Sequence, residues 1–310
     1  MAYTISIGQF EQSIPAFCEF VTAKGSPKTG VAYACDLRQY AQYVRSLPVL
    51  VDGALSTSLA RQYFSFLREA KNEDSTIIRK LAALSSYCDF LRAETVPSLP
   101  NPFLRLPLKR SLRANKEPKP VDTLLLELIL SGIDNLRDQA LFRLLLATGL
   151  RISEVHALNR DSISIHEERN GDVRVITGSG EIVGKGNKRR RFFVDEATLI
   201  AYAGYVTSRS DASAALFVSA RGTRLSVRGI QYRLAHWCEK FGAPHINVHR
   251  LRHTFATVLA NNDIDSVALR HLMGHASFTT TMQYFKLHDK TIRRQYHAAM
   301  GRAKRRNPST

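Results

Sequence analysis

The sequence lacks the apolar runs, signal segment and cysteine pairs that mark several classes of protein. Its longest apolar stretches, such as Leu124–Leu130, contain or adjoin charged residues, so no membrane span is expected. Met1–Phe17 has no basic start followed by an apolar run, which favours a cytoplasmic protein over a secreted one. The four cysteines have no C-x-x-C spacing, and no Asp/Glu cluster shows ligand spacing. We therefore expect buried free thiols, no metal and no cofactor.

Acidic residues are also scarce. Asp and Glu number 27 against 44 Lys and Arg, which gives a formal net charge of +17. Such an excess of positive charge indicates a polyanionic partner, and nucleic acid fits better than a membrane surface. With 310 residues, of which 44% are hydrophobic, the chain is long enough for two domains with buried cores.

The first 96 residues predict a helical bundle. Apolar residues recur with helical spacing in four segments, Glu11–Lys24, Pro27–Ser46, Thr57–Lys71 and Ser75–Arg92. In the last of these, Ser75 is the expected N-cap, and Arg79 and Lys80 lie outside the apolar stripe. The stripe predicts a packed core, and the two basic residues are candidates for contact with DNA phosphates.

Residues 97–120 differ in composition from both flanks. Prolines alternate there with basic residues, among them Lys109 and Arg110. This composition is typical of a semi-rigid cationic linker. It either crosses the DNA backbone, with Lys109 and Arg110 in contact with it, or is an exposed tether without DNA contact.

Residues 121–310 predict a second, mixed domain. Two helices are expected between Val121 and Leu146. Short strands at Ser162–Ile165, Val173–Ile176 and Arg191–Val194 should then form a small antiparallel sheet, with Ile165–Gly180 as an extra loop. Amphipathic helices follow at Glu196–Ser208 and Val227–Phe241. Arg221, Arg224 and Arg228 cluster at the start of the second, where they either position DNA phosphates or form a solvated basic face. The predicted fold class is thus mainly α with a small antiparallel sheet.

The last third of the chain carries the motif His249-Arg250-Leu251-Arg252. In a helix, positions i and i+3 share a face, so His249 and Arg252 form a donor pair directed at one point. A guanidinium and an imidazole side by side suit a phosphate. His253 is expected to have a structural role at the start of the helix.

A tyrosine follows a second histidine. Gly274 is the expected C-cap of a helix from Asp265 to Met273, and it precedes His275. Ser277 or the threonines 279–281 then start a short helix that carries Tyr284. A phenol titrates near pH 10, so it attacks phosphorus well only where cations stabilise the phenolate and the transition state.

Further cations lie upstream. Arg151 follows Gly149, with Glu154 at i+3 where its carboxylate can hold the guanidinium. Lys185 lies between two glycines in a turn that continues into Lys188, Arg189, Arg190 and Arg191, residues suited to DNA contact.

These motifs, A-T-G-L-R-x-S-E, G-K-G-N-K, H-x-L-R-H and L-x-G-H followed nine residues later by tyrosine, make the chain resemble the tyrosine recombinases of the Xer and phage-integrase type. The resemblance implies a core-binding SAM-like domain (1–96), a linker (97–120) and a catalytic domain (121–310). It implies that Tyr284 is the nucleophile and that Arg151 and Arg252 clamp the phosphate. His249 and His275 would donate hydrogen bonds or carry protons, Lys185 would be the acid for the leaving oxygen, and Glu154 would support Arg151. Lys188 is the alternative to Lys185.

The resemblance also implies the reaction and its partners. Tyr284 would form a 3′-phosphotyrosyl link to double-stranded DNA at a recombination site, without a metal. Homo-tetramers on two sites, with a second recombinase or accessory protein in some members, would exchange strands for integration, excision or resolution, as in mobile elements. The helical pattern of Lys290–Arg302 would dock on a neighbouring protomer. A type IB topoisomerase, a non-catalytic DNA-binding protein and a metal-dependent nuclease are the alternatives.

Overall fold

The chain folds into two compact units, residues 1–115 and 116–310. The computed structural model describes residues 5–24, 27–47, 53–95, 97, 99–104, 120–170, 173–184, 189–275, 277–285, 296–297 and 300. The predicted linker contacts Lys109 and Arg110, the predicted acids Lys185 and Lys188, and most of the predicted end helix 290–302 lie outside these residues. Each unit is described by itself.

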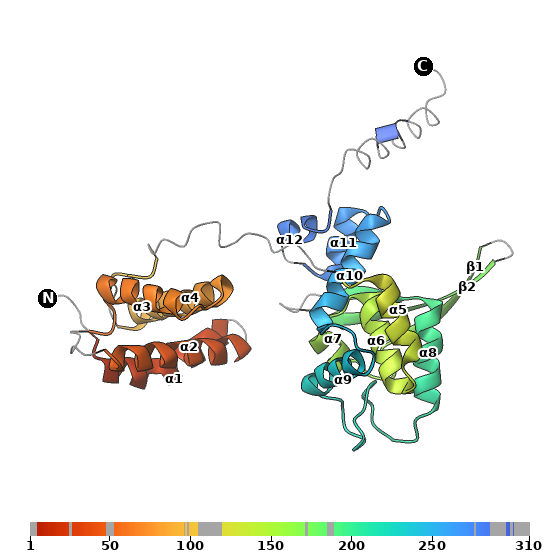
Figure 1. The fold of residues 1–310 in the computed structure, drawn as a ribbon, viewed down its shortest axis with the longest axis horizontal. Coiled ribbons are helices and arrows are strands. Elements are labelled where there is room, and N and C mark those ends of the chain that lie inside the picture. Colours follow the sequence, from red (N-terminus) through yellow and green to blue (C-terminus); the bar gives the residue numbers. More distant parts are fainter. Residues whose placement is uncertain are drawn as a thin grey trace. The chain divides into compact units, whose positions relative to one another are not determined.

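The N-terminal unit consists of the helices α1 Ile7–Lys24, α2 Pro27–Arg45, α3 Thr57–Glu69 and α4 Asp74–Glu94 (Figure 1). Its core is rich in aromatic rings in tilted or edge contact. The ring centroids of Phe10 and Tyr87 are 4.7 Å apart, and those of Tyr40 and Tyr63 are 4.9 Å apart. Such pairs stabilise a core beyond the effect of burial alone.

Two helix starts differ from the sequence prediction. α1 begins at Ile7 rather than Glu11, because Ser6 and Gln9 bond reciprocally: the Gln9 amide donates to Ser6 Oγ at 3.3 Å, and the Ser6 amide donates to Gln9 Oε1 at 3.0 Å. The prediction of Ser75 as an N-cap is wrong, since α4 starts at Asp74 with Glu73 as its cap residue.

The C-terminal unit combines helices with one sheet. Its helices are α5 Thr123–Gly132, α6 Leu136–Thr148, α7 Ile152–Ala157, α8 Glu196–Thr207, α9 Val227–Lys240, α10 Val248–Asn261, α11 Ser266–Met273 and α12 Phe278–Met282. Its strands are β1 Ser164–Asn170, β2 Val173–Val183 and β3 Arg189–Val194, in the order β1-β2-β3 and antiparallel throughout. The predicted fold class, mainly α with a small antiparallel sheet, is confirmed.

The predicted strands Val173–Ile176 and Arg191–Val194 are confirmed within β2 and β3. The remainder of the segment predicted as an extra loop, Ile165–Gly180, is mostly strand as well. β1 and β2 pair from Ser164 opposite Ser179 to Asn170 opposite Val173, and they form a ribbon that reaches beyond the helices of this unit (Figure 1). The Arg174 and Glu167 side chains form an ion pair across the ribbon at 2.9 Å. β3 pairs only with the second half of β2, and its side chains alternate so that Arg190, Phe192 and Val194 point inward.

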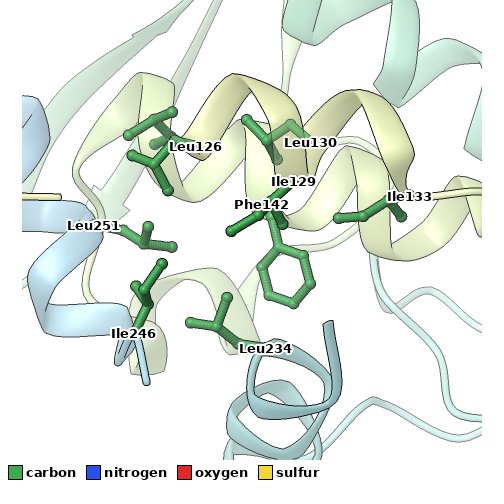
Figure 2. A pocket seen from close by; sticks show the side chains of 9 residues that line it. Leu126, Ile129, Leu130, Ile133, Phe142, Leu234, Ile246 and Leu251 are labelled. Atoms are coloured by element: carbon green, nitrogen blue, oxygen red, sulfur yellow. The ribbon is translucent and has the colours of Figure 1, made fainter. Parts of the chain in front are cut away.

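Apolar side chains fix α10 against the other helices of this unit. Figure 2 shows Leu126, Ile129, Leu130 and Ile133 of α5 facing Phe142 of α6, Leu234 of α9, and Ile246 and Leu251 at and beside the start of α10. The gap among them is about 10 Å³, room for the centre of a single water, and its apolar walls offer that water no partner. This packing matters for function because α10 carries Arg252.

No helix in the described part of the chain is long and apolar enough to cross a bilayer.

A buried carboxylate joins three elements of the C-terminal unit. Asp138 is fully buried on α6 and accepts hydrogen bonds from Arg137, from Arg233 Nε at 2.6 Å and from Trp237 Nε1 at 2.8 Å. Arg137 also donates to the Val218 carbonyl at 3.0 Å. The carboxylate therefore ties α6 to α9 and to the segment between α8 and α9.

Replacing Asp138 with alanine should lower the free energy of unfolding by about 3 kcal/mol, because it strands two guanidiniums and an indole N–H around an uncharged site. Urea unfolding followed by the fluorescence of Trp237, the only tryptophan of the chain, measures the change. Asp134→Ala is the matched control, since Asp134 is 75% exposed in its ion pair with Lys240 and should change stability by less than about 0.5 kcal/mol. Equal effects of the two substitutions would contradict a structural role of Asp138.

Candidate active site

Helix α10 presents three functional side chains on one face. Asn247 caps the helix by accepting from the Arg250 amide at 2.9 Å, and the helix then places His249, Arg252 and His253 at positions i, i+3 and i+4. Arg252 is 3% exposed and donates to the carbonyls of Gly149 and Met273. Its guanidinium thus links the C-terminal ends of α6 and α11.

Arg151 is held in the way its spacing predicts. It is the N-cap residue of α7, and its amide donates to Glu154 Oε2 at 2.6 Å while its guanidinium donates to Glu154 Oε1 at 2.9 Å. The same guanidinium donates to the Gly274 carbonyl at 3.0 Å. The predicted contact between Arg151 and Glu154 is confirmed.

Arg190 differs from the prediction. The sequence placed it among surface contacts to DNA, but β3 turns it inward and its side chain is 5% exposed. It donates to Glu154 Oε2 at 2.6 Å and to the Leu272 carbonyl. A Cβ on Gly274 would lie 2.7 Å from Arg190 Nε, and Gly274 has a φ of +59°, so both packing and backbone require glycine there. Arg190 therefore belongs to the inside of the site.

Three guanidiniums converge on the end of α11. The carbonyls of Leu272, Met273 and Gly274 accept from Arg190, Arg252 and Arg151 in turn, at a helix C-terminus where carbonyls carry partial negative charge. Burial, and then the charges of Arg151 and Arg190, lower the pKa of Arg252 to about 10. Among the described residues, Glu154 is the only carboxylate that pairs with this cluster, so the cluster keeps a surplus of positive charge.

A cavity of about 500 Å³ opens beside these cations. Arg151, His249 and Arg252 line it, together with Ser153 and Asn247. Fixed guanidiniums and an imidazole around an open, polar cavity suit a phosphodiester with its flanking sugars.

The two predicted site histidines are uncharged at neutral pH in the free protein. Burial, reinforced by Arg252 and Arg151, lowers the pKa of His249 and lowers that of His275 to about 4. His275 follows Gly274, which caps α11 in the left-handed conformation as predicted, and its Nδ1 lies 2.9 Å from the Thr281 hydroxyl. An incoming phosphate would raise both pKa values, because a nearby negative charge favours the imidazolium.

Tyr284 lies directly after α12, whose N-cap is Ser277, one of the two predicted starts. The tyrosine is 6% exposed and packs against Ala256, Leu269 and Met273. Its hydroxyl is 2.6 Å from His253 Nδ1, and its ring stacks on His275 with a centroid separation of 6.3 Å. Burial raises the pKa of the phenol, against the opposing charge of Arg252. Tyr284 does not line the 500 Å³ cavity, but it adjoins it through His253 and His249.

Two residues of the site were missed from the sequence. His253 was assigned a structural role, although its i+4 spacing from His249 places it on the same helix face. Arg190 lies in a run of four basic residues. Only the alternation of inward and outward side chains along β3 distinguishes it from its neighbours.

The other predicted DNA contacts fall into two groups. Arg224 differs from the prediction, since its guanidinium donates to the carbonyls of His156 and Leu158 and to the Asn159 side chain and so holds the chain together. The remainder keep exposed positions or exposed contacts and stay predictions: Arg79, which pairs with Asp36, Lys80, which donates to Gln39, and Arg189, Arg221 and Arg228. Among the described residues, no group of three or more His, Cys, Asp or Glu side chains could hold a metal ion.

Arg190→Ala should reduce the free energy of unfolding by about 3 kcal/mol, because it removes a buried partner of Glu154 and of the α11 end. Arg191→Ala, one residue along the same strand and exposed, should change it by less than about 0.5 kcal/mol. Urea unfolding followed by Trp237 fluorescence compares the two variants. A loss of DNA affinity in Arg190→Ala at unchanged stability would restore the surface assignment.

Acid should destabilise the C-terminal unit through two histidines. The folded-state pKa of His253 and His275 is about 4, against 6.5 for a free histidine, so between these values the unfolded chain binds protons that the folded chain does not. Stability is therefore complete above about pH 6.5 and falls as the pH falls toward 4, by on the order of 1 kcal/mol per histidine after allowance for partial exposure. Urea midpoints at about pH 7 and about pH 5 measure this, and the double variant His253→Asn, His275→Asn should flatten the dependence. An unchanged slope in that variant would refute the assignment.

Comparison with known proteins identifies the family. The Phage integrase family matches residues 119–291, and the Phage integrase, N-terminal SAM-like domain matches residues 14–95. The chain is 32% identical to the tyrosine recombinase XerC of Neisseria gonorrhoeae over 96% of this chain and 98% of the relative. It is 33% identical to the tyrosine recombinase XerC of Alcanivorax borkumensis over 91% and 90%.

Solved structures share the fold. The XerH site-specific recombinase bound to difH substrate has a TM-score of 0.68 at 19% identity, covering 94% of this chain and 83% of that one. The Tn1549 transposon integrase in complex with a circular intermediate DNA has a TM-score of 0.68 at 19% identity, covering 95% and 100%. Together with the family match and the full-length relatives, the site described above shows that the chain belongs to the phage integrase family and is a tyrosine-type site-specific recombinase.

Proposed function

We propose that Tyr284 cleaves one DNA strand at a recombination site by attacking the phosphodiester held by Arg151 and Arg252. The observation that carries this proposal is the buried phenol placed beside a surplus of guanidinium charge at the end of α11. In phosphoryl transfer, fixed cations that stabilise the charge developing on the phosphate oxygens usually make the largest contribution to the rate enhancement.

In the proposed step, the Tyr284 oxygen forms a bond to phosphorus and the bond from phosphorus to the 5′-oxygen breaks. The products are a 3′-phosphotyrosyl enzyme and a free 5′-hydroxyl, whose proton comes from Lys185 or, alternatively, Lys188. The phosphodiester energy is kept in the new link. A 5′-hydroxyl of a second duplex can therefore reverse the step on a new strand without ATP.

His249 and His275 would donate to the non-bridging oxygens. Each has a pKa below its ordinary value in the free protein, and each faces Arg252 and Arg151, so the phosphate charge that offsets these arginines also favours a protonated imidazole. Both groups would then be recruited when DNA binds.

We infer that the protein acts in the cytoplasm on double-stranded DNA as a homo-tetramer that brings two sites together, alone or with a second recombinase or accessory protein. Two cleavage and rejoining rounds on four strands need four phenols, which supports this number. The exposed Arg79, Arg189, Arg221 and Arg228 and the half-buried Lys80 are the proposed phosphate contacts, since backbone contacts fix register without reading sequence.

Trapping of covalent adducts tests the proposal. Nicked duplexes tiled across the DNA that flanks the gene lose a short 5′-hydroxyl fragment on cleavage, so that the phosphotyrosyl enzyme accumulates. Tyr284→Phe should lower adduct formation by on the order of 10⁴-fold or more, because the nucleophile is gone. Tyr232→Phe, at a tyrosine of α9 that is 69% exposed, is the matched control and should keep the wild-type rate.

Adducts of undiminished yield in Tyr284→Phe would refute the assignment of the nucleophile. Relaxation of supercoiled DNA that carries no cleavable site, at the rate seen with cleavable DNA, would favour the topoisomerase alternative.

A further inference from the structure

His253 contacts the hydroxyl of Tyr284, the proposed nucleophile. Its Nδ1 lies 2.6 Å from the Tyr284 hydroxyl, and the two rings are 5.7 Å apart at 45°. Tyr284 is 6% exposed, so bulk water is a poor substitute for this partner. Burial raises the pKa of the phenol, which keeps its proton in the free protein, and the hydroxyl is therefore the donor in this bond.

The acceptor is a neutral imidazole. Burial, followed by the neighbouring His249 and Arg252, lowers the pKa of His253 to about 4. The His249 ring meets the His253 ring edge to face at 4.5 Å, and the His275 ring stacks on Tyr284 at 6.3 Å. With Nδ1 as the acceptor, the ring proton of His253 resides on Nε2.

A phenol that attacks phosphorus must lose its proton as the new bond forms. The hydrogen bond to Nδ1 directs the O–H bond away from the phosphate and leaves an oxygen lone pair free for the attack. His249 and His275, by contrast, are assigned to the phosphate, and Arg252 has no lone pair to offer. The Tyr284 side chain also bonds to Gln283, a contact that lowers the pKa of the phenol, but an amide is not basic enough to take up the proton. His253 Nδ1, at 2.6 Å, is the basic acceptor among the described contacts of the hydroxyl.

We propose that His253 is a catalytic residue that accepts the Tyr284 proton during strand cleavage, an inference that rests on the proposed function. As the bond from the Tyr284 oxygen to phosphorus forms, the proton passes to Nδ1 and gives an imidazolium. The bond from phosphorus to the 5′-oxygen breaks, and that oxygen takes its proton from a separate donor. In rejoining, the imidazolium returns its proton to the phenol oxygen while the 5′-hydroxyl attacks.

The bound phosphate makes the transfer favourable. Without DNA, an imidazolium at His253 is disfavoured by burial and repelled by Arg252. A phosphodiester brings one negative charge, and more charge develops on its oxygens in the transition state, so the basicity of His253 rises at the moment when the proton must move.

Three variants separate proton transfer from simple packing. His253→Leu removes the acceptor at similar volume, His253→Asn keeps a hydrogen-bond acceptor near the Nδ1 position but cannot take up the proton, and His253→Ala leaves space for free imidazole. We expect single-turnover cleavage to fall by about 10²-fold or more in all three at unchanged DNA affinity, with recovery of His253→Ala in added imidazole. His166→Leu, at an exposed histidine of β1, is the control for general effects.

A wild-type rate in His253→Asn would overturn the proton transfer and leave only a hydrogen bond. A substrate with sulfur in place of the bridging 5′-oxygen adds a second discriminator, because a thiolate leaves without a proton. The loss in His253→Asn should persist on that substrate, and full recovery there would overturn the assignment by placing His253 on the leaving-group side. Trp237 fluorescence in urea verifies that each variant is folded.

Nitrogen-15 NMR of the histidines in the free protein gives a test that needs no DNA. His253→Asn identifies the His253 signals among the ten histidines, Nδ1 should resonate as an unprotonated acceptor, and Tyr284→Phe should shift it. No response to Tyr284→Phe would overturn the role of His253 while leaving the proposed function intact. If the Nδ1 signal shifts in Tyr284→Phe but the wild-type protein forms no covalent adduct on any DNA, the proposed function is overturned. The role of His253 in cleavage then fails with it.

Discussion

Three guanidiniums bound to three successive carbonyls at the end of α11 determine the geometry of this active site. Arg190, Arg252 and Arg151 reach that end from β3, α10 and the start of α7. Because the same carbonyls precede His275 and the turn to α12, the position of Tyr284 is fixed relative to these three cations. Losing any one arginine would therefore disturb both charge and position. Arg190 and Arg252 are buried, and their hydrogen bonds offset part of the cost of burying charge.

In the free protein, the positive charge of this site exceeds its negative charge. Glu154 pairs with two arginines, whereas Arg252 donates to backbone carbonyls and forms no ion pair within the described part of the chain. Carbonyl dipoles satisfy its hydrogen-bonding capacity without cancelling its charge, so its pKa is lowered and the neighbouring imidazoles stay neutral. The missing charge is that of an anion. A DNA phosphate would supply the negative charge that the site lacks and would favour protonation of its imidazoles. DNA binding would therefore also activate the site.

The sequence predicted the fold class and several contacts because they depend on local spacing. The bond between Arg151 and Glu154 and the glycine cap before His275 follow from helix geometry within a few residues. Arg190 could not be placed in this way, since its partners Glu154 and Leu272 are distant along the chain and the basic run around it hides the strand alternation. Only short pieces of β1 and β2 were predicted as strands, because the solvent-exposed faces of this ribbon show no clear apolar alternation along most of its length.

The role of His253 could not be predicted from local spacing. Helical spacing puts it on the face of His249 and Arg252, but the same spacing fits an ordinary packed histidine. A catalytic histidine differs from a packed one in the partner of its imidazole. Here that partner is Tyr284, which follows α11 and α12 in the chain. A buried phenol is a poor nucleophile because burial favours its neutral form. Burial is tolerable for a nucleophile only if an acceptor is buried with it, and the chain supplies that acceptor one residue after the arginine that binds the phosphate.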